Sequence, residues 1–494
     1  MVWPTEFDVK LEKYNAMEIP GQQLSAAQAF TPLDHLLNLD IKAPAGCQRL
    51  TGIIANMGKS TSDVDTLEKM MSAGMNIAML NMSYGTREEH IEMIKLLRQA
   101  AKNFSVNMGK NYPLAIAARL AGKKIRTGSI ADSYGETVEL KTGDVIRLTT
   151  DETYKDRCST YAIYVDFMYF ADQITKGDLV LIDNETIMLK VEIISTSTVT
   201  CKIERGGMLG SYKDVFVPNV VFEMPNFSEK DKLDIDMLIH QQTANGIMIT
   251  RQELGSDITP KKLVIAQKNM IARANKANVP VCVNAHLLSS MRYKKLPLRA
   301  ELLDVANCIL DGADTLELSA ETAVGLYPVD TVACLASACK EAEACIWSKQ
   351  IFHDFVDKTP IPCDQATGVG LAAVLAAQRS LAAAIIVVTT TGKSAQIVSK
   401  YGPRCPIIGV TRYAAIARQL HLWRGIIPLI FEDAPDADWQ IDLECRVNFC
   451  TKWAMDQGFV RVGDPIVVVS GWKQGAGYTN TMRIVYAAAD CSVV

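Results

Sequence analysis

The sequence lacks three features that would place it in broad functional classes. Basic residues are not in excess, since 51 Lys and Arg stand against 55 Asp and Glu, and the net charge of −4 gives no footprint for nucleic acid. No clean membrane span is present, because the most apolar region, residues 369–388, is interrupted by Gln378 and Arg379. The first residues mix acids and bases without an apolar stretch, which predicts no secretory signal.

Paired metal or redox motifs are absent too. The 13 cysteines are scattered without a C-x-x-C pair, and their number is odd. This pattern favours reduced thiols in a cytoplasmic protein over a disulfide framework. The six histidines are equally dispersed, which argues against a structural zinc site.

The chain instead has the length and periodicity of a multidomain α/β protein. Its 494 residues, 49% of them hydrophobic, suffice for roughly two to four domains. Short strand-like runs alternate with amphipathic helices, first at residues 51–56, 76–81 and 113–118, and again at 246–250, 280–285 and 314–319. Six such strands predict βαβ units in a parallel sheet, with functional residues at the carboxyl ends of the strands.

Helix signals support these units. Ser62 or Asp63 can cap the helix after the first strand, and Gly74 can end it. Thr86 and Glu89 have the spacing of a capping box at the start of the next helix.

Two other regions have a different pattern. From about Lys124 to Val217 the apolar residues alternate with a period of two, which predicts a small all-β domain inserted into the βα series. After about Ile361, four apolar runs at 383–390, 406–411, 426–431 and 464–470 alternate with helices and predict an open, doubly wound sheet. The G-K-S of residues 392–394 is not a phosphate-binding Walker loop, because Val387 stands where that loop requires glycine.

Nearly the whole chain resembles the pyruvate kinase family. The segments that carry the resemblance, in the family's order, are TPLDHLLNLDI, TGIIANMG, NIAMLNMSYGT, GKKIRTG, GGMLGSYK, NFSEKD, GIMITRQELG, RAELLDVANCILDGAD, LSAETAVGLYP, VTRYAAIARQLHLWRGIIP, RVNF and GWKQGAGYTNTMR. The resemblance implies a TIM-type (β/α) barrel with an inserted β-barrel lid domain and a C-terminal doubly wound α/β domain.

The implied domains are an N-terminal helical segment (1–45), the barrel (46–122 and 218–345), the lid (123–217) and the C-terminal effector-type domain (346–494). The barrel is shortened by two βα units, since only 14 residues separate Asp231 from Gly246. The family's catalytic lysine and one magnesium-binding glutamate have no counterpart there. A barrel of six strands would either close around a narrower interior or stay open on one side.

The resemblance also implies an altered active site. Met79 stands at the position of the family's phosphate-binding arginine, and Ala285 at that of a threonine linked to proton delivery. Asn81 and Ser83 of the potassium site persist, but Arg119 and Leu120 replace the aspartate and threonine that complete it.

Other positions keep part of the family's chemistry. Arg126 and Arg251 remain as phosphate-binding remnants, with a purely structural role as the alternative for each. Lys124 matches family members that work without potassium, and Glu253 is a single, weak magnesium ligand. The cofactors implied are therefore magnesium and potassium, both at incomplete sites, and a protein that binds neither is the alternative.

The C-terminal region departs less from the family. The resemblance places a fructose bisphosphate effector site on the following residues: Thr389, Thr391, Gly392, Ser394, Trp439, Arg446, Gly475 and Gly477. Thr390 and Lys393 differ from the lysine and arginine of effector-regulated members, and a tryptophan on a helix can equally be a core residue.

Three functions stay open on this basis. The first is a pyruvate kinase-like protein that has lost most or all catalysis of the family's glycolytic reaction (phosphoenolpyruvate and ADP to pyruvate and ATP) and keeps binding or regulation. The second is an active pyruvate kinase with an altered cation requirement, and the third is a structural subunit of a larger assembly. The family's contact helix, kept at residues 299–314, implies a homodimer or homotetramer.

Overall fold

A computed structural model describes residues 23–46, 48–119, 125–131, 135, 137–183, 186–218, 220, 246–251 and 260–488. The chain divides into two compact units. The first consists of Met1–Arg119, Gln242–Thr250 and Ile265–Val494, and the second of Leu120–Gln241 and Arg251–Val264. The finer division into four domains stays a prediction. Among the described residues, no helix is long and apolar enough to cross a membrane.

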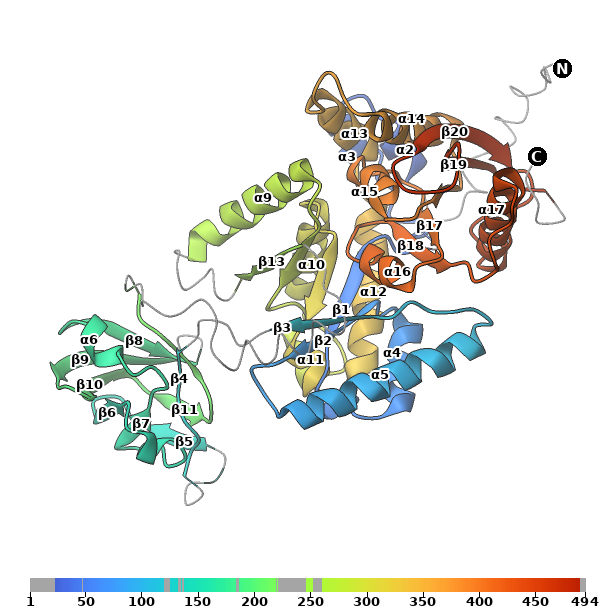
Figure 1. The fold of residues 1–494 in the computed structure, drawn as a ribbon. Coiled ribbons are helices and arrows are strands. Elements are labelled where there is room, and N and C mark those ends of the chain that lie inside the picture. Colours follow the sequence, from blue (N-terminus) through green and yellow to red (C-terminus); the bar gives the residue numbers. More distant parts are fainter. Residues whose placement is uncertain are drawn as a thin grey trace, which may run out of the picture. The chain divides into compact units, whose positions relative to one another are not determined.

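The first unit contains a curled parallel sheet of six strands (Figure 1). Its strands, in spatial order, are β13 (Ile247–Thr250), β14 (Val281–Asn284), β15 (Thr315–Leu318), β1 (Gly52–Asn56), β2 (Ile77–Asn81) and β3 (Ala115–Arg119). All neighbours in this order pair in parallel, and β13 and β3 are the edges of the described sheet. The six predicted strands and their parallel pairing are confirmed.

Helices connect these strands and cover the sheet. They are α4 (Val64–Ala73), α5 (Arg87–Asn107), α9 (Pro260–Ala277), α10 (Arg299–Leu310), α11 (Ala320–Ala323) and α12 (Pro328–Ala344). The predicted helix caps are present. The Asp63 carboxylate accepts a hydrogen bond from Thr66 N at 2.8 Å, and Glu89 N donates to Thr86 Oγ1 at 3.3 Å. Gly74 ends α4 with φ of +120°, a conformation that costs residues with a Cβ.

The N-terminal segment of the described chain packs through one histidine. It contains α2 (Leu24–Ala27) and α3 (Pro32–Leu37), and the Thr31 side chain caps α3. The buried His35 ring hydrogen-bonds to the carbonyls of Ala26 at 2.8 Å and Cys345 at 3.0 Å. The second bond ties the segment to the carboxyl end of α12.

The C-terminal part of the first unit is an open sheet with helices on both faces. Its strands, in spatial order, are β18 (Ile426–Ile430), β17 (Ile407–Thr411), β16 (Ala384–Val388), β19 (Pro465–Gly471) and β20 (Thr479–Tyr486). Only β20 runs antiparallel to its neighbour. The helices are α13 (Ser348–Asp357), α14 (Gln365–Ser380), α15 (Lys393–Lys400), α16 (Ala414–Leu420) and α17 (Trp439–Asp456).

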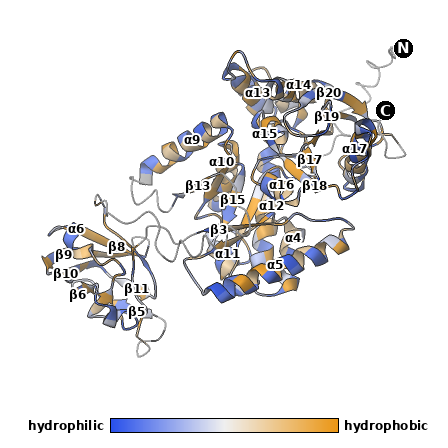
Figure 2. Ribbon diagram, viewed as in Figure 1, coloured by the Kyte–Doolittle hydropathy of each residue, from blue (hydrophilic) through white to orange (hydrophobic). Residues whose placement is uncertain are grey.

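Side chains that alternate along the central strands pack against the helices on the two faces of the sheet. Ile385 and Val387 join one buried apolar cluster, whereas Ile386 and Val388 join the other. A strand buried on both faces must be hydrophobic throughout. Figure 2 shows β17 and β18 largely in orange, the colour of hydrophobic residues. The predicted doubly wound sheet is confirmed.

The second unit is an all-β domain with its own core. Its larger sheet has the order β4 (Ile125–Arg126), β12 (Asp214–Phe216), β8 (Leu179–Ile182), β9 (Ile187–Ile194), β10 (Thr198–Arg205), β6 (Val145–Thr149) and β7 (Ala162–Tyr164). A separate pair is formed by β11 (Gly207–Gly210) and β5 (Thr137–Leu140), and one short helix, α6 (Phe170–Gln173), is added. β8 and β9 pair antiparallel, with Leu181 opposite Met188, as the period-two alternation of this region leads one to expect.

Candidate functional site

Polar side chains gather at the carboxyl ends of the parallel strands in the first unit. Asn56 ends β1, Asn81 ends β2, Arg119 ends β3, and Asn284 ends β14. Register brings them together in pairs, because Asn81 is opposite Arg119 and Asn284 is opposite Glu317 of β15. Since side chains alternate along a strand, these residues lie on the same face as the apolar residues two positions earlier.

Those earlier positions form an apolar layer. The buried cluster consists of Ile54, Ile77, Met79, Ala115 and Cys282, with Ala117 and Met248 packed against it. Met79 is only 4% exposed within this layer. The side chain at the predicted phosphate position therefore serves as packing, and an arginine here would need a partner for its charge.

A buried carboxylate occupies the polar layer above. Glu317 is 1% exposed, and its Oε1 accepts from Asn56 Nδ2 at 2.6 Å. Burial raises the pKa of Glu317, whereas the hydrogen bond from Asn56 and the positive charge of Arg119 oppose that shift. The positive charge of Arg119 therefore favours the ionised form of Glu317, but it does not cancel the effect of burial.

The segments that follow β14 and β15 extend this polar layer. Ser319 Oγ donates to Asn284 Oδ1 at 3.0 Å, and Ser319 N donates to Glu321 Oε2 at 2.7 Å. Ser289 Oγ also donates to Glu321, at 3.2 Å. Sequence reasoning missed Asn56, Asn284 and Glu317, although a glutamate between two leucines in the apolar run 314–319 is a signal that could have indicated a buried charge.

The predicted potassium residues lie at this edge as well. Asn81 and Ser83 are half-buried, and Asn81 Oδ1 accepts from Ser83 N at 3.1 Å in a local turn. Arg119, also half-buried, is the residue paired with Asn81 on the adjacent strand. The structure therefore places the positive charge of Arg119 next to Asn81 and Ser83, the two residues that the resemblance assigns to a bound potassium ion.

The loop after β14 is strained. Ala285, His286 and Leu288 have φ values of +75°, +58° and +53°, which non-glycine residues seldom adopt. Such conformations concentrate at functional sites, where the surrounding structure holds them in place. Ala285, the position linked to proton delivery, lies here but offers only a methyl group.

The remaining barrel residues of the prediction are dispersed or outside the described residues. In the second unit, Arg126 Nε pairs with Asp214 at 3.0 Å and its backbone N–H donates to Asp166. Arg251 is buried at the end of β13. Leu120, Lys124, Glu253 and the segment between Asp231 and Gly246 lie outside the described residues. Within the described ranges, no cluster of three or more His, Cys, Asp or Glu side chains could hold a metal ion.

The predicted effector loop connects β16 to α15. Gly392, with φ of +83°, directly precedes α15, and its N–H donates to Thr389 Oγ1 at 2.9 Å. The Ser394 and Thr479 hydroxyls lie 2.6 Å apart, whereas Thr391 is exposed. Gly475 and Gly477 lie in the loop between β19 and β20, both with positive φ. Hydroxyls and a helix start in one place suit an anion.

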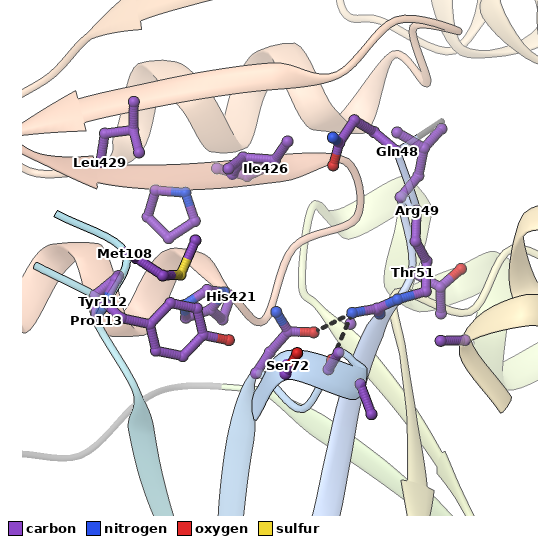
Figure 3. A pocket seen from close by; sticks show the side chains of 18 of the residues that line it. Gln48, Arg49, Thr51, Ser72, Met108, Tyr112, Pro113, His421, Ile426 and Leu429 are labelled. Carbon is purple, nitrogen blue, oxygen red and sulfur yellow. Dashed lines mark hydrogen bonds between the residues drawn. The ribbon is translucent and has the colours of Figure 1, made fainter. Parts of the chain in front are cut away.

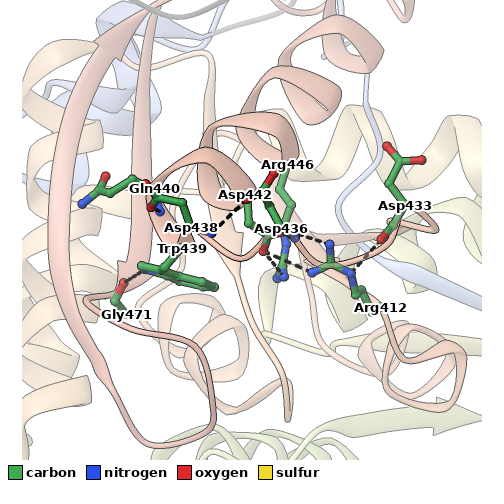
Figure 4. Close-up of polar contacts among 9 residues, drawn as sticks. All are labelled: Arg412, Asp433, Asp436, Asp438, Trp439, Gln440, Asp442, Arg446 and Gly471. Carbon is green, nitrogen blue, oxygen red and sulfur yellow. Dashed lines mark hydrogen bonds and ion pairs between the residues drawn. The ribbon is translucent and has the colours of Figure 1, made fainter.

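The arginine and tryptophan assigned to the same site are engaged within the protein (Figure 4). Trp439 Nε1 donates to the Gly471 carbonyl at 3.0 Å. Arg446 is 6% exposed and forms an ion pair with Asp442, one helical turn earlier. Asp442 also accepts from both terminal nitrogens of Arg412, at 2.6 and 3.2 Å. One buried carboxylate therefore holds two guanidinium groups.

A cavity of about 370 Å³ lies at the opposite, amino-terminal ends of β1, β2 and β3 (Figure 3). Arg49 spans part of it, donating to Gly74 O at 2.6 Å and to Asn76 Oδ1 at 2.7 Å. His421 contributes a ring whose burial lowers its pKa to about 4, and the nearby Arg49 charge adds to this effect. His421 is therefore neutral near pH 7.

These features define an α/β-barrel protein with an accessory α/β domain. They are the curled parallel sheet with a polar layer at its carboxyl edge, the all-β insertion and the doubly wound C-terminal sheet. Comparison with known proteins narrows this class. The family model for the pyruvate kinase barrel domain matches residues 48–244 and 239–332, and that for the pyruvate kinase alpha/beta domain matches residues 368–485.

Individual relatives agree. The chain is 38% identical to pyruvate kinase PKLR of Rattus norvegicus, over 94% of this chain and 89% of the relative. It is 33% identical to pyruvate kinase 1 of Saccharomyces cerevisiae, over 92% of this chain and 99% of the relative. The chain therefore belongs to the pyruvate kinase family, which confirms the resemblance inferred from its motifs.

Proposed function

We propose that this protein is a pyruvate kinase-like protein that has lost most or all catalysis and acts in binding, regulation or assembly. The observation that carries the proposal is the carboxyl edge of the barrel sheet. There, Met79 packs in an apolar layer, and Arg119 places a positive charge near the buried Glu317. Transfer of a phosphoryl group needs cations around the phosphate and bound metal ions. Met79 removes one of these cations, and Arg119 replaces an acid that completes the family's potassium site. A coupled assay of phosphoenolpyruvate turnover tests the proposal.

The family's cofactors fit this edge poorly. A potassium ion near Asn81 and Ser83 would face the guanidinium of Arg119 in place of a carboxylate, so like charges would repel. For magnesium, the predicted single ligand Glu253 lies outside the described residues. We therefore assign no reaction step to either ion.

An active enzyme with an altered cation requirement is the second candidate. Arg119 favours it, because a guanidinium beside Asn81 can itself supply the positive charge of a monovalent cation. Lys124 would add a second fixed charge. The two candidates differ in one measurement: an enzyme of this kind would turn over phosphoenolpyruvate equally with and without potassium.

Fructose bisphosphate is the ligand we expect the C-terminal loop to bind. At 100 times the dissociation constant it should stabilise the fold by about 3 kcal/mol, a shift of roughly 5–10 °C in the melting temperature. Thr391→Val should reduce this shift while leaving the ligand-free melting temperature unchanged, because Thr391 is exposed. Differential scanning fluorimetry with millimolar ligand measures both, and the absence of any shift would exclude the site.

Arg446→Ala is a less clean variant for this purpose. Sequence alone suggests that it would abolish the ligand effect and leave the ligand-free protein nearly unchanged. In the structure, however, Arg446 is buried and paired with Asp442. We now expect the variant to lower the ligand-free melting temperature as well, so its result must be compared with that of Thr391→Val.

We also propose a homodimer or homotetramer, formed in part through α10. This helix leaves Leu303 and Leu310 exposed at 68% and 49%. Closed symmetric assemblies are common for such chains, and burial of these leucines would favour one. Light scattering at micromolar concentration should return two or four times the 54.2 kDa of the chain. A mass near that of one chain would contradict the proposal.

A structural role within a larger assembly is a third candidate, and we place all three in the cytoplasm. Gel filtration of the endogenous protein from its own cells distinguishes the third candidate from the others. A species much larger than the purified oligomer would favour it, and co-elution with the purified protein would exclude it.

A further inference from the structure

Two buried oxygen atoms at the carboxyl edge of the barrel sheet lack a hydrogen-bond donor. They are Oε2 of Glu317 and Oδ1 of Asn56, and neither has a partner among the described residues. The two side chains are only 1% and 6% exposed. They are also neighbours, because Asn56 Nδ2 donates to Glu317 Oε1 at 2.6 Å. Buried acceptors of this kind cost free energy unless a donor or a bound ion satisfies them.

The charged groups near these atoms are two carboxylates and one guanidinium. Burial and, to a smaller degree, the like charge of Glu321 raise the pKa of Glu317, whereas the charge of Arg119 lowers it. Glu321 is itself 5% exposed, and it accepts hydrogen bonds from the uncharged groups Ser319 N and Ser289 Oγ. Two carboxylates against one guanidinium leave one negative charge without a counter-charge.

Oxygen atoms of this kind suit a hard cation. Carboxylate and amide oxygens are common ligands of such ions, and they can replace the water shell of a monovalent ion. A single unmatched negative charge balances a monovalent ion, whereas a divalent ion would leave the cluster positive. The described ranges also contain no group of three acidic, histidine or cysteine side chains that could hold a metal ion.

We propose that Glu317 and Asn56 bind a small monovalent cation within the barrel sheet, with Glu317 Oε2 and Asn56 Oδ1 among its ligands. This position differs from the one that the resemblance assigns to Asn81 and Ser83. Glu317 and Asn56 belong to β15 and β1, whereas Asn81 ends β2 opposite a guanidinium. A buried water molecule would donate to the same two oxygens but would not offset the charge. Binding of the ion does not depend on catalysis.

The test measures binding of rubidium, a substitute for potassium, by equilibrium dialysis, with tetramethylammonium chloride keeping the ionic strength constant. We expect one rubidium ion per chain. Glu317→Gln keeps the volume of the side chain and removes its charge, so the affinity should fall by about 100-fold or more, as for loss of one partner of a buried ion pair. Glu444→Gln, the same substitution at a partly exposed glutamate of α17, should leave the affinity unchanged.

Thermal melting gives a second readout and verifies folding. At 10 times its dissociation constant, the ion should raise the melting temperature by about 3–6 °C, and Glu317→Gln should lose this shift. In tetramethylammonium chloride alone, Glu317→Gln should melt no lower than the unmodified protein, because a buried amide costs less than an unmatched charge. Glu317→Met, also of similar volume, replaces Glu317→Gln if the latter does not fold.

Asn81→Ala separates the two positions, and we expect it to retain the bound rubidium. Retention of rubidium by Glu317→Gln together with its loss from Asn81→Ala would locate the ion at the family's potassium position and overturn the proposal. Absence of rubidium binding to the unmodified protein would overturn it as well, and a buried water molecule is then the partner of the two oxygens. Competition with potassium, sodium and ammonium chloride identifies the preferred ion.

Discussion

Purified protein should convert phosphoenolpyruvate and ADP far more slowly than one turnover per second, even with millimolar magnesium and potassium. Typical enzymes reach about 1 to 1,000 per second, and loss of one electrostatic stabiliser of the transition state costs about 10²–10³ in rate. Here a phosphate-binding arginine is replaced by the buried Met79, and an acid by Arg119. The effects of such losses do not simply add, but a 10²-fold loss alone would bring a median rate of about 10 per second to about 0.1 per second.

Pyruvate kinase PKLR of Rattus norvegicus, assayed in parallel with lactate dehydrogenase and NADH, is the positive control. The variant Met79→Arg/Arg119→Asp tests whether two substitutions account for the loss. We expect it to stay inactive, because Arg119→Asp also leaves Glu317 beside a second acid instead of a cation. Turnover of about one per second by the unmodified protein would refute the loss of catalysis.

The strands could be predicted from sequence because each is a short apolar run between turn or cap signals. The bounds of the third strand could not be predicted in the same way. The apolar run suggests residues 113–118, whereas the strand is Ala115–Arg119. Backbone pairing with Asn81 extends the strand to Arg119, and a pattern of side chains does not report that pairing.

The candidate site could be predicted only in part, because sequence patterns report local positions and not contacts between distant residues. Met79, Arg119 and Ala285 stand out once the motifs are matched to the family. The partnership of Asn56 with Glu317 joins residues 261 positions apart, so no local pattern reports it. The same holds for Arg412 and Asp442, whereas Asp442 and Arg446 have the i, i+4 spacing of a helical ion pair and could have been identified.

The second large effect concerns Asp442, whose side chain is 4% exposed between two guanidinium groups. Asp442→Ala removes the partner of Arg446, itself 7% exposed, and leaves a buried charge uncompensated. Breaking a buried pair in this way costs about 3–5 kcal/mol. At 2–4 °C per kcal/mol for a unit of this size, the melting transition of the C-terminal sheet should fall by roughly 10 °C.

Glu444, on the same helix, is the matched control because its ion pair with Arg483 is largely solvated, with side chains 40% and 33% exposed. Glu444→Ala should cost at most about 1 kcal/mol, since screening by water weakens such pairs. Asp442→Asn keeps the volume and one acceptor oxygen, so its melting temperature should fall between the two. Circular dichroism melts of the three variants measure the series. If Asp442→Ala melts within 2 °C of Glu444→Ala, Asp442 does not hold these two arginines in place, and Arg446 is then free to serve an effector phosphate without competition from within the protein.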